Sequence, residues 1–365
     1  MYPPGSPILI LLYGDLLMNK PDFFVGIDIA SLTFTAAVGQ LQEGSWRIVG
    51  KPKEFGNHYE SFPDFLHWLQ EQQLTPHTCV LCMEASGVYN ELLAHVLVAN
   101  HYRLAIQPPL EVKKAFKPVG HKTDPVDSGQ ISEYAYRFFD KLTFWQPRDE
   151  ILEQIKVLLA TREQFSGQIT AHKNARQALL RKKVHTPLAE QAHLEAIQEL
   201  QGHLKTLEQE IQRLIDQNPD FKRLVGLLLT VPGVGLLLAA HVLVLCESAP
   251  QLPTPKQLSA FIGICPYQKT SGTSVHAPPT SRHYGPPMIR KLLRLASLSL
   301  RTHNPTFRQY FERKVAEGKP KKVALNNIAN KLLKFICAVL RSATPFDKNY
   351  RSVKPGCLNT ALTKS

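Results

Sequence analysis

Short apolar runs separated by turn residues fill the first part of the chain. The run "FFVGIDIA" predicts a buried strand, and "TFTAAVGQ" and "WRIVGKP" predict two more strands joined by short turns. An apolar helical face at 58–73, the strand "TCVLCMEA", a helix at 88–99 and the strand "YRLAIQP" follow. Three consecutive strands and then alternating helices and strands predict a mixed α/β sheet domain.

The middle of the chain, residues 150–217, has a helical repeat instead. Its apolar positions recur at alternating steps of three and four, the a/d pattern of a coiled coil, at Ile197, Leu200, Leu204, Leu207, Ile211 and Leu214. A similar rhythm upstream is interrupted by Arg162, His172 and Arg176, and "HTPLAE" contains a break. The pattern predicts two long helices, which form either a hairpin within one chain or an arm between two chains.

The last region, residues 221–347, is helical and strongly basic. In "LLLTVPGVGLLLAAHVL", a turn with Gly233 and Gly235 lies between two apolar helical runs. It is either a plain tight turn or a helix-hairpin-helix element whose amides meet a DNA phosphate. Residues 221–365 hold 22 Lys and Arg against 4 Asp and Glu, a net charge of +18, whereas residues 1–150 carry −5. This concentration of positive charge indicates binding to a phosphate backbone.

Composition narrows the class of protein. The chain has 365 residues, of which 44% are hydrophobic and 20% charged, as in a soluble protein of two or three domains. Cys79 and Cys82 form a CxxC inside an apolar run without metal-ligand partners, which predicts buried cysteines in a reducing cytoplasm. The N-terminal run "PILILLYGDLLM" is too short and too interrupted to span a membrane.

Together these patterns predict a ribonuclease-H-like (RuvC-like) mixed sheet, a helical coiled-coil arm and a mainly helical basic domain. The actin-like ATPase fold begins similarly, but it needs later glycine-rich phosphate loops that this sequence lacks. The expected segments are a disordered leader at 1–21, a RuvC-like domain at 22–148, a coiled-coil arm at 149–220, a basic helical domain at 221–347 and a tail at 348–365.

Four carboxylates are candidate metal ligands. Asp28 ends the first strand in "GIDIA", and Glu84 ends a later strand in "MEASG". Asp124 and Asp127 lie three residues apart in "KTDPVDS", where Pro125 predicts a helix start. Mg²⁺ prefers such hard oxygen ligands, and two ions can clamp the attacking and leaving oxygens of a phosphodiester. Taken singly, each residue is equally an ordinary turn residue or helix cap.

A family resemblance joins these motifs. "GIDIA", "MEASGVYN", "KTDPVDS", "VPGVG", "LSAFIGICPYQKTSGTSV" and "ATPFD" occur in the order found in DEDD transposases of the IS-one-ten insertion-sequence family, also called bridge-RNA-guided recombinases. The resemblance covers roughly residues 22–347. It implies a RuvC-like domain whose Mg²⁺ ligands are the four acids above, a coiled-coil arm, and a transposase domain with a nucleophilic serine. That serine matches Ser271, which Gly272 follows.

The resemblance also implies partners. Such enzymes are expected to assemble as dimers and tetramers around a structured noncoding guide RNA, one loop of which pairs with target DNA and another with donor DNA. Serine is a weak nucleophile that needs activation, and a covalent phosphoserine would conserve the phosphodiester bond energy for strand exchange. The alternative for Ser271 is an ordinary loop hydroxyl, and Ser274 is a neighbouring candidate.

The region after Ser271 departs from the family pattern. "VHAPP" replaces a glycine-containing stretch, Arg282 and His283 stand where the family has Ser-Lys, and two prolines precede the next basic helix. The catalytic positions are unaffected, but the loop geometry and the activity of this copy are in question. Candidate phosphate contacts, each alternatively an exposed charge, are Lys113, Lys114, Lys117, Lys122, Arg282, His283, Arg290 and Arg294.

The favoured interpretation is a bacterial RNA-guided DNA transposase, cytoplasmic and associated with the nucleoid when active, without a membrane partner. One alternative is a RuvC-like nuclease that hydrolyses branched nucleic acid with the four acids and does not need Ser271. The other is a catalytically dead copy that keeps the basic nucleic-acid-binding domain.

Overall fold

The structure is a computed structural model that divides into two compact units, residues 1–148 and 149–365, each of which is described by itself. The described residues are 20–116, 124–147, 149–247, 254–271, 275–281 and 285–348. Most of the expected leader and tail therefore lies outside the described residues.

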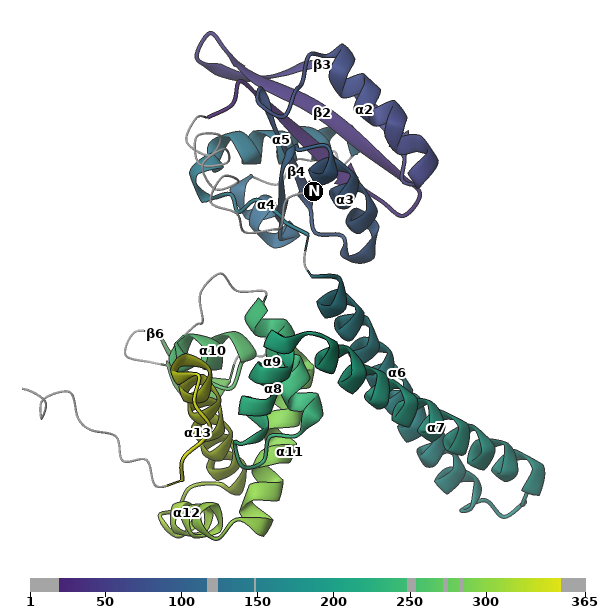
Figure 1. The fold of residues 1–365 in the computed structure, drawn as a ribbon, viewed down its shortest axis with the longest axis vertical. Coiled ribbons are helices and arrows are strands. Elements are labelled where there is room, and N and C mark those ends of the chain that lie inside the picture. Colours follow the sequence, from purple (N-terminus) through teal and green to yellow (C-terminus); the bar gives the residue numbers. More distant parts are fainter. Residues whose placement is uncertain are drawn as a thin grey trace, which may run out of the picture. The chain divides into compact units, whose positions relative to one another are not determined.

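The first unit is built on a five-stranded mixed sheet (Figure 1). Its strands are β1 (Phe23–Ile29), β2 (Thr33–Gln42), β3 (Ser45–Gly56), β4 (Cys79–Glu84) and β5 (Arg103–Gln107). Their order is β3-β2-β1-β4-β5, with β1 to β3 antiparallel and with β4 and β5 parallel to β1. Three antiparallel strands followed by two parallel ones are the arrangement that the sequence predicts.

Helices cover both faces of this sheet because its central strands are apolar on both sides. On one face, Val25 and Ile27 pack with α2 (Phe62–Glu71) and α3 (Glu91–Ala99). On the other, Phe24 packs against α5 (Asp124–Arg137). The short η1 (Tyr59–Ser61), η2 (Gly87–Asn90), α4 (Pro109–Ala115) and η3 (Phe139–Lys141) complete the unit. Successive residues of β1 thus face opposite helical layers.

Helix α5 lies directly on the backbone of β1. Ser132 Oγ donates a hydrogen bond of 2.6 Å to the carbonyl oxygen of Phe24. A Cβ added to Gly26 would collide with the backbone of Ser128 and Ser132. Glycine at position 26 is therefore needed for the close approach of the helix to the strand.

The second unit begins with a long helical hairpin (Figure 1). Helices α6 (Glu150–Leu179) and α7 (Pro187–Gln217) pack along each other within the chain. Arg162 Nε donates to Glu208 Oε1 at 2.6 Å, and Arg176 Nη2 donates to Glu190 Oε1 at 2.8 Å. Of the two arrangements that the repeat allows, the structure shows the intramolecular hairpin.

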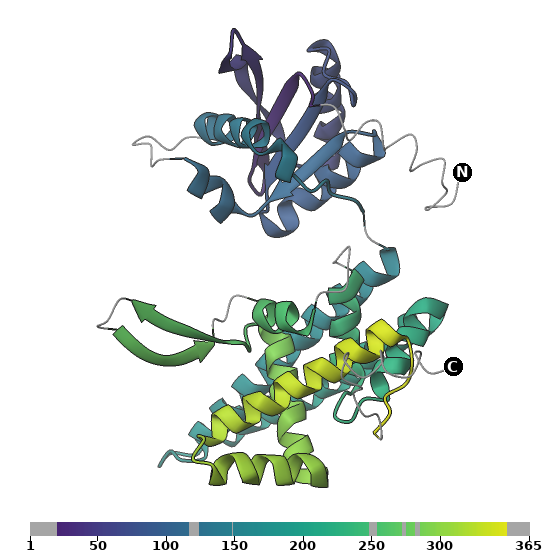
Figure 2. The same ribbon diagram turned by 90° about the vertical axis from the view of Figure 1, so that its left-hand side faces the viewer.

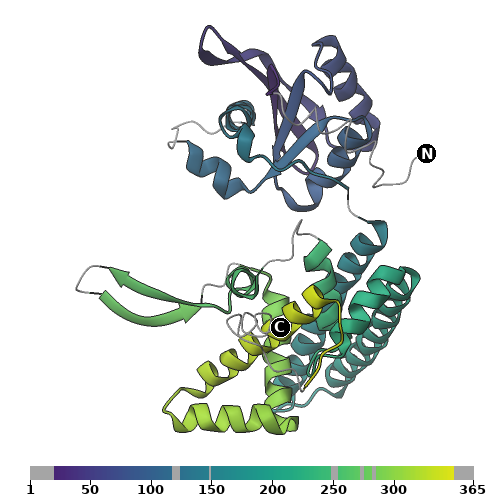
Figure 3. The same cartoon turned by 60° about the vertical axis from the view of Figure 1, so that its left-hand side comes forward.

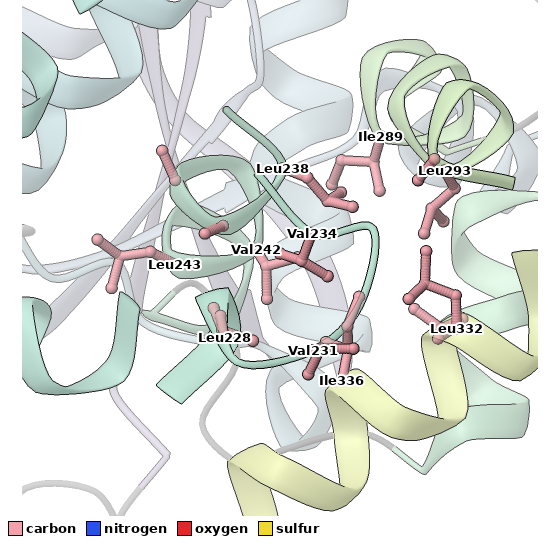
Figure 4. Packing of buried hydrophobic residues seen from close by; sticks show 14 of the residues in the cluster. Leu228, Val231, Val234, Leu238, Val242, Leu243, Ile289, Leu293, Leu332 and Ile336 are labelled. Atoms are coloured by element: carbon pink, nitrogen blue, oxygen red, sulfur yellow. The ribbon is translucent and has the colours of Figure 1, made fainter. Parts of the chain in front are cut away.

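Within the described residues, six shorter helices follow the hairpin and form the core of this unit together with residues of α6 and α7. They are α8 (Pro219–Leu229), α9 (Leu236–Glu247), α10 (Pro255–Ile262), α11 (Pro287–His303), α12 (Pro305–Ala316) and α13 (Lys321–Ser342). Several begin at strong sequence signals: Asn218, Thr254 and Asn304 each accept a hydrogen bond from the first helical turn, and a proline follows each of them. Apolar residues of α8, α9, α11 and α13 meet in the core shown in Figure 4.

The Pro-Gly-Val-Gly turn between α8 and α9 is part of that core. Val231 and Val234 are buried and lie among the labelled side chains of α9, α11 and α13 (Figure 4). Gly233 has a φ of +84°, and a Cβ there would lie 2.9 Å from Leu300 Cγ. The glycine is therefore required by local conformation and packing, while contact of the turn amides at Gly233 and Gly235 with a DNA phosphate stays a prediction.

A two-stranded ribbon, β6 (Pro266–Ser271) and β7 (Val275–Ser281), leaves the helices at the end of α10. Figures 2 and 3 show it in green, extending away from the helical core of its unit. Ser271 is the last residue of β6 and pairs with Val275, the first residue of β7. This serine is therefore at the far end of the ribbon.

Among the described helices, α13 alone is long and apolar enough, by length and composition, to cross a membrane. Half of it is buried, and its apolar residues pack in the core of the second unit. The predicted burial of the β4 cysteines is confirmed: Cys79 and Cys82 are free and buried, and burial raises the pKa of each thiol to about 12. They are therefore inert thiols at neutral pH.

Candidate active site

Two of the predicted acids lie side by side at one edge of the sheet. The parallel register of β1 and β4 pairs Ile27 with Met83, and Asp28 and Glu84 each follow that pair by one residue. Alternation along the strands places both acids on the side of Phe24 and Cys82, the face that α5 covers. Both residues are half-buried. The sheet register therefore brings these two carboxylates to neighbouring positions.

The first turn of α5, which carries the other two acids, points toward the same edge. Ser132 Oγ donates to the carbonyl oxygen of Phe24, and the carbonyl oxygen of Ser128 lies against Gly26. The later residue of the helix thus meets the earlier residue of the strand, so α5 runs antiparallel to β1. Moving from Ser128 toward the start of α5 leads toward the end of β1 that carries Asp28. Asp127 immediately precedes Ser128 and is half-buried, and Asp124 is the first residue of the helix.

The donor chemistry of this edge fits a hard divalent cation, since every candidate ligand is a carboxylate. Within the described side chains, no three His, Cys, Asp or Glu residues gather closely enough to hold a metal ion. The side chain of Asp124 is not among them. The structure thus places Asp28 beside Glu84 and directs the start of α5 toward them, and the complete four-carboxylate site remains a prediction.

Asn57, which the motif analysis does not single out, fastens the loops beside these acids. Its Nδ2 donates to the carbonyl oxygens of Ala30 and Tyr89, each at 2.9 Å, and its backbone amide donates to Leu32 O at 2.8 Å. Ala30 and Tyr89 belong to the segments that follow β1 and β4. One amide therefore holds together the two loops that leave Asp28 and Glu84. The only sequence signal is an Asn after a glycine at a strand end, in "EFGNHYE".

The predicted basic contacts have different outcomes. Lys113 and Lys114 are exposed in the last turn of α4, and Arg294 is exposed on α11. Arg290 is half-buried, and its Nη1 donates to Ile262 O at 2.9 Å and to Gly285 O at 2.7 Å. Arg290 therefore bonds two backbone carbonyls through Nη1, and its predicted phosphate contact stays a prediction. Outside the described residues lie Lys117, Lys122, Gly272, Ser274, Arg282 and His283.

Three basic side chains that the sequence motifs do not single out lie around Tyr310. Lys331 Nζ lies 4.3 Å from the centre of this ring, Arg313 Cζ 5.6 Å and Lys314 Nζ 6.0 Å. Burial and the neighbouring charges of Arg313, Lys334 and Lys314 lower the pKa of Lys331. Glu317 pairs with Lys314 at 2.6 Å and offsets part of this charge. We call Tyr310, Arg313, Lys314 and Lys331 the Tyr310 cluster.

Two family models match the chain. A DEDD transposase model of the IS110 type matches residues 25–185, and a model described as transposase of the IS116/IS110/IS902 family matches residues 225–312. The chain is therefore a DNA transposase of the DEDD class. It belongs to the IS110 family, the one that the sequence motifs indicate. The four acids lie in the first matched range and Ser271 in the second.

Curated relatives extend the match over most of the chain. The pilin gene-inverting proteins of Moraxella bovis and Moraxella lacunata are each 28% identical over 329 residues, covering 89% of this chain and 98% of theirs. An insertion element IS110 uncharacterized 43.6 kDa protein of Streptomyces coelicolor is 30% identical over 143 residues, 39% of this chain and 34% of its own. A Thermus thermophilus RuvC structure aligns at a TM-score of 0.26 and 12% identity, over 34% of this chain and 99% of RuvC.

Proposed function

We propose that this transposase cuts and rejoins donor and target DNA through a covalent serine-phosphodiester intermediate. Ser271 is the nucleophile, Asp28, Glu84, Asp124 and Asp127 hold Mg²⁺, and a structured guide RNA selects the two DNA sites. The enzyme acts in the bacterial cytoplasm on chromosomal DNA. The observation that carries the metal-dependent chemistry is the adjacent placement of Asp28 and Glu84 on β1 and β4, facing α5.

In the serine step, one phosphate ester bond forms for each one that breaks, and one proton is transferred. In the proposed attack, an O–P bond forms between Ser271 Oγ and the DNA phosphorus while the bond from phosphorus to one deoxyribose oxygen breaks. Serine loses one proton, and the freed deoxyribose hydroxyl gains one. Attack by a deoxyribose hydroxyl of the exchanged strand reverses these changes and releases Ser271. Phosphate ester bonds are exchanged one for one, so the reaction needs no ATP.

In this scheme, the role of the carboxylates is to bind the divalent cation and to fix its position. A divalent cation, when bound, supplies Lewis-acid stabilisation of charge on the phosphate oxygens. Asp28 and Glu84 are held in register by the sheet, and the contact of α5 with Gly26 fixes the direction of the helix that starts at Asp124. The rigid strands and helix therefore pre-organise the oxygen ligands before DNA arrives.

Rejoining distinguishes this proposal from a hydrolytic nuclease. The Moraxella relatives are named as inverting a pilin gene, and inversion of a DNA segment requires that every broken strand is resealed. A nuclease that transfers the phosphate to water cannot reseal it without an energy source. Transfer to Ser271 and back meets this requirement, which is why we favour it over the nuclease and over a purely binding protein.

RNA guidance and oligomerisation form the finer part of the proposal, which the family resemblance supports. In α7, Leu200, Leu204 and Leu207 remain half-buried although α6 packs along the helix. This leaves apolar surface on the a/d row for a second copy, as a coiled-coil dimer arm would require.

Sequencing of RNA that copurifies with the protein tests guidance by RNA: the loops of that RNA should match the flank of the insertion element and a target. Absence of one specific RNA would contradict it.

The Tyr310 cluster supports contact with a nucleic-acid backbone. Three cations lie around one aromatic ring, and Glu317 pairs with two of them, Lys314 and Arg313. Like charges at this spacing repel one another, and a bound phosphate would relieve that repulsion. We therefore include the Tyr310 cluster in the DNA-binding surface.

The central experiment follows formation of a covalent protein–DNA adduct on a DNA fragment spanning one end of the gene's own insertion element. Ser271→Ala should form no adduct and no recombinant product while it still binds the fragment. Ser274→Ala is the matched control and should form both. Strand exchange by Ser271→Ala at the wild-type rate would exclude the serine mechanism, and cleavage without exchange would favour the nuclease.

A further inference from the structure

The two segments that join the Ser271 ribbon to its unit lie next to each other. The chain leaves α10 at Ile262, forms β6 and β7, and returns at Gly285 just before α11. A Cβ added to Gly285 would collide with the carbonyl oxygen of Phe261, so the returning backbone touches the last turn of α10. The place where the chain departs and the place where it returns are therefore in direct contact, and only glycine permits it.

Arg290 binds both segments at the base of the ribbon. Its Nη1 donates one hydrogen bond to Ile262 O, before the ribbon, and a second to Gly285 O, after it. Hydrogen bonds from a charged donor are stronger than those between neutral groups. Arg290 is half-buried on α11, which is itself packed into the core. A single guanidinium nitrogen thus holds the departure and the return of the ribbon against a fixed helix.

Two asparagines of α13 hold the segment that leads from α10 to β6. Asn326 Nδ2 and Asn330 Nδ2 donate to the carbonyl oxygen of Ile264 at 2.9 and 3.2 Å. Ser259 Oγ donates to Asn330 Oδ1 at 2.6 Å, which orients the amide so that its nitrogen faces Ile264. Gly263, with a φ of +80°, ends α10 in the left-handed conformation that brings Ile264 to this place.

We propose that Arg290, Asn326 and Asn330, here called the ribbon clamp, are positioning residues for Ser271. An isolated two-stranded hairpin is marginally stable in water, so the direction of this ribbon depends on how its base is held. An error of about 1 Å in the position of a reacting group costs on the order of 100-fold in rate. The ribbon clamp acts through the ribbon, and its residues need not touch DNA. This inference rests on the proposed role of Ser271.

The test measures single-turnover formation of the covalent adduct by full-length protein with its copurified nucleic acid retained. The probe is the DNA fragment spanning one end of the insertion element. We expect Arg290→Met to slow adduct formation by about 10- to 100-fold. The dissociation constant for the fragment and its salt dependence should be unchanged, and Arg290→Lys should restore part of the rate. Lys291→Met, which removes an exposed charge from the same helix, should react like wild type.

Two results would overturn the assignment of Arg290. If Arg290→Met lowers the slope of log K against log salt by about 0.9, the residue contacts a phosphate instead. If it lowers only the melting temperature and reacts at the wild-type rate well below that temperature, its role is merely structural. Should Arg290→Met fail to fold, Asn326→Ala, which removes one hydrogen bond, provides the second variant. It should slow adduct formation by about threefold to tenfold without weakening DNA binding.

The outcome of Ser271→Ala separates this inference from the proposed function. Adduct formation by Ser271→Ala would contradict the proposed function itself, independently of the results for the ribbon-clamp variants. Loss of the adduct in Ser271→Ala, together with wild-type rates in Arg290→Met and Asn326→Ala, would overturn only the ribbon clamp.

Discussion

The two units present their candidate catalytic groups in opposite ways. In the first, Asp28 and Glu84 extend from central strands of a five-stranded sheet, where register and a covering helix fix them. In the second, Ser271 ends a strand of a two-stranded ribbon, and polar contacts at the base of that ribbon fix its direction. The comparison teaches that groups on central strands are positioned by the sheet itself, whereas a group at the end of a two-stranded ribbon depends on the contacts at the base of that ribbon.

The largest expected effect concerns the sheet acids. Asp28→Asn should reduce DNA cleavage by at least about 1000-fold, because a divalent cation contributes several kcal/mol to such reactions and each 1.4 kcal/mol is tenfold. Removal of divalent cations with a chelator should have the same effect, measured as cleavage of the DNA fragment. Asp22→Asn, an exposed acid just before the same strand, should cleave normally. Full activity of Asp28→Asn in chelator would refute the metal site.

A second prediction tests how α5 is held. Gly26→Ala should destabilise the first unit by about 1–3 kcal/mol, because its Cβ must displace α5 from β1. Cleavage should fall with it, since the acids of α5 move. The measurement is denaturant unfolding together with the cleavage rate.

Gly129→Ala on α5 is the control for this change. A Cβ there would lie at an ordinary 3.6 Å from Ile48 Cδ1, and Ala is a better helix former than Gly by about 1 kcal/mol. It should leave the stability unchanged or raise it. Equal loss in both variants would show that the Gly26 contact has no special importance.

A smaller effect is expected at the Tyr310 cluster. Lys331→Ala should weaken binding to a short DNA duplex severalfold and lower the slope of log K against log salt by about 0.9, the loss of one phosphate contact. Lys256→Ala removes an exposed charge from α10 and should change neither value. Titrations at several salt concentrations provide the slopes. An unchanged slope for Lys331→Ala would place the Tyr310 cluster outside the DNA-binding surface.

The smallest effect concerns His241 on α9. Burial, with a contribution from the charge of Arg162, lowers the pKa of His241 from 6.5 to about 4. Between these two pH values, His241 is protonated in the unfolded chain and neutral in the folded chain. The free energy of unfolding therefore falls as pH decreases from about 6.5 toward 4. His241→Gln should flatten this part of the stability curve, measured by denaturant unfolding at pH 7 and pH 5. A curve identical to wild type would show that another group controls acid stability.

Much of the architecture follows from local sequence patterns. The strand "FFVGIDIA", the a/d repeat of α7 and the Asn-Pro and Thr-Pro helix starts are visible because periodicity and capping involve residues close in sequence. The order of the acids and the concentration of positive charge after residue 221 are likewise written along the chain. The packing of Val231 and Val234 into the core, in contrast, is not visible in the letters of the Pro-Gly-Val-Gly turn.

Arg290 shows most clearly what the sequence leaves open. In the linear chain it is one more basic residue on an amphipathic helix, and a phosphate contact is a natural prediction. Only folding brings Ile262 O and Gly285 O within reach of its Nη1. The same holds for Asn57, whose partners Ala30 and Tyr89 lie 27 and 32 residues away.

The sequence by itself therefore determined the elements, the family and the chemical types of the candidate groups, because these depend on neighbouring residues and on motif order. The tertiary structure decided which of those groups meet. It brought Asp28 and Glu84 to neighbouring positions through sheet register, packed α5 onto Gly26, gathered three cations around Tyr310 and joined Arg290 to the carbonyl oxygens of Ile262 and Gly285. Each of these is a contact between distant segments, which forms only when the apolar faces of strands and helices pack together.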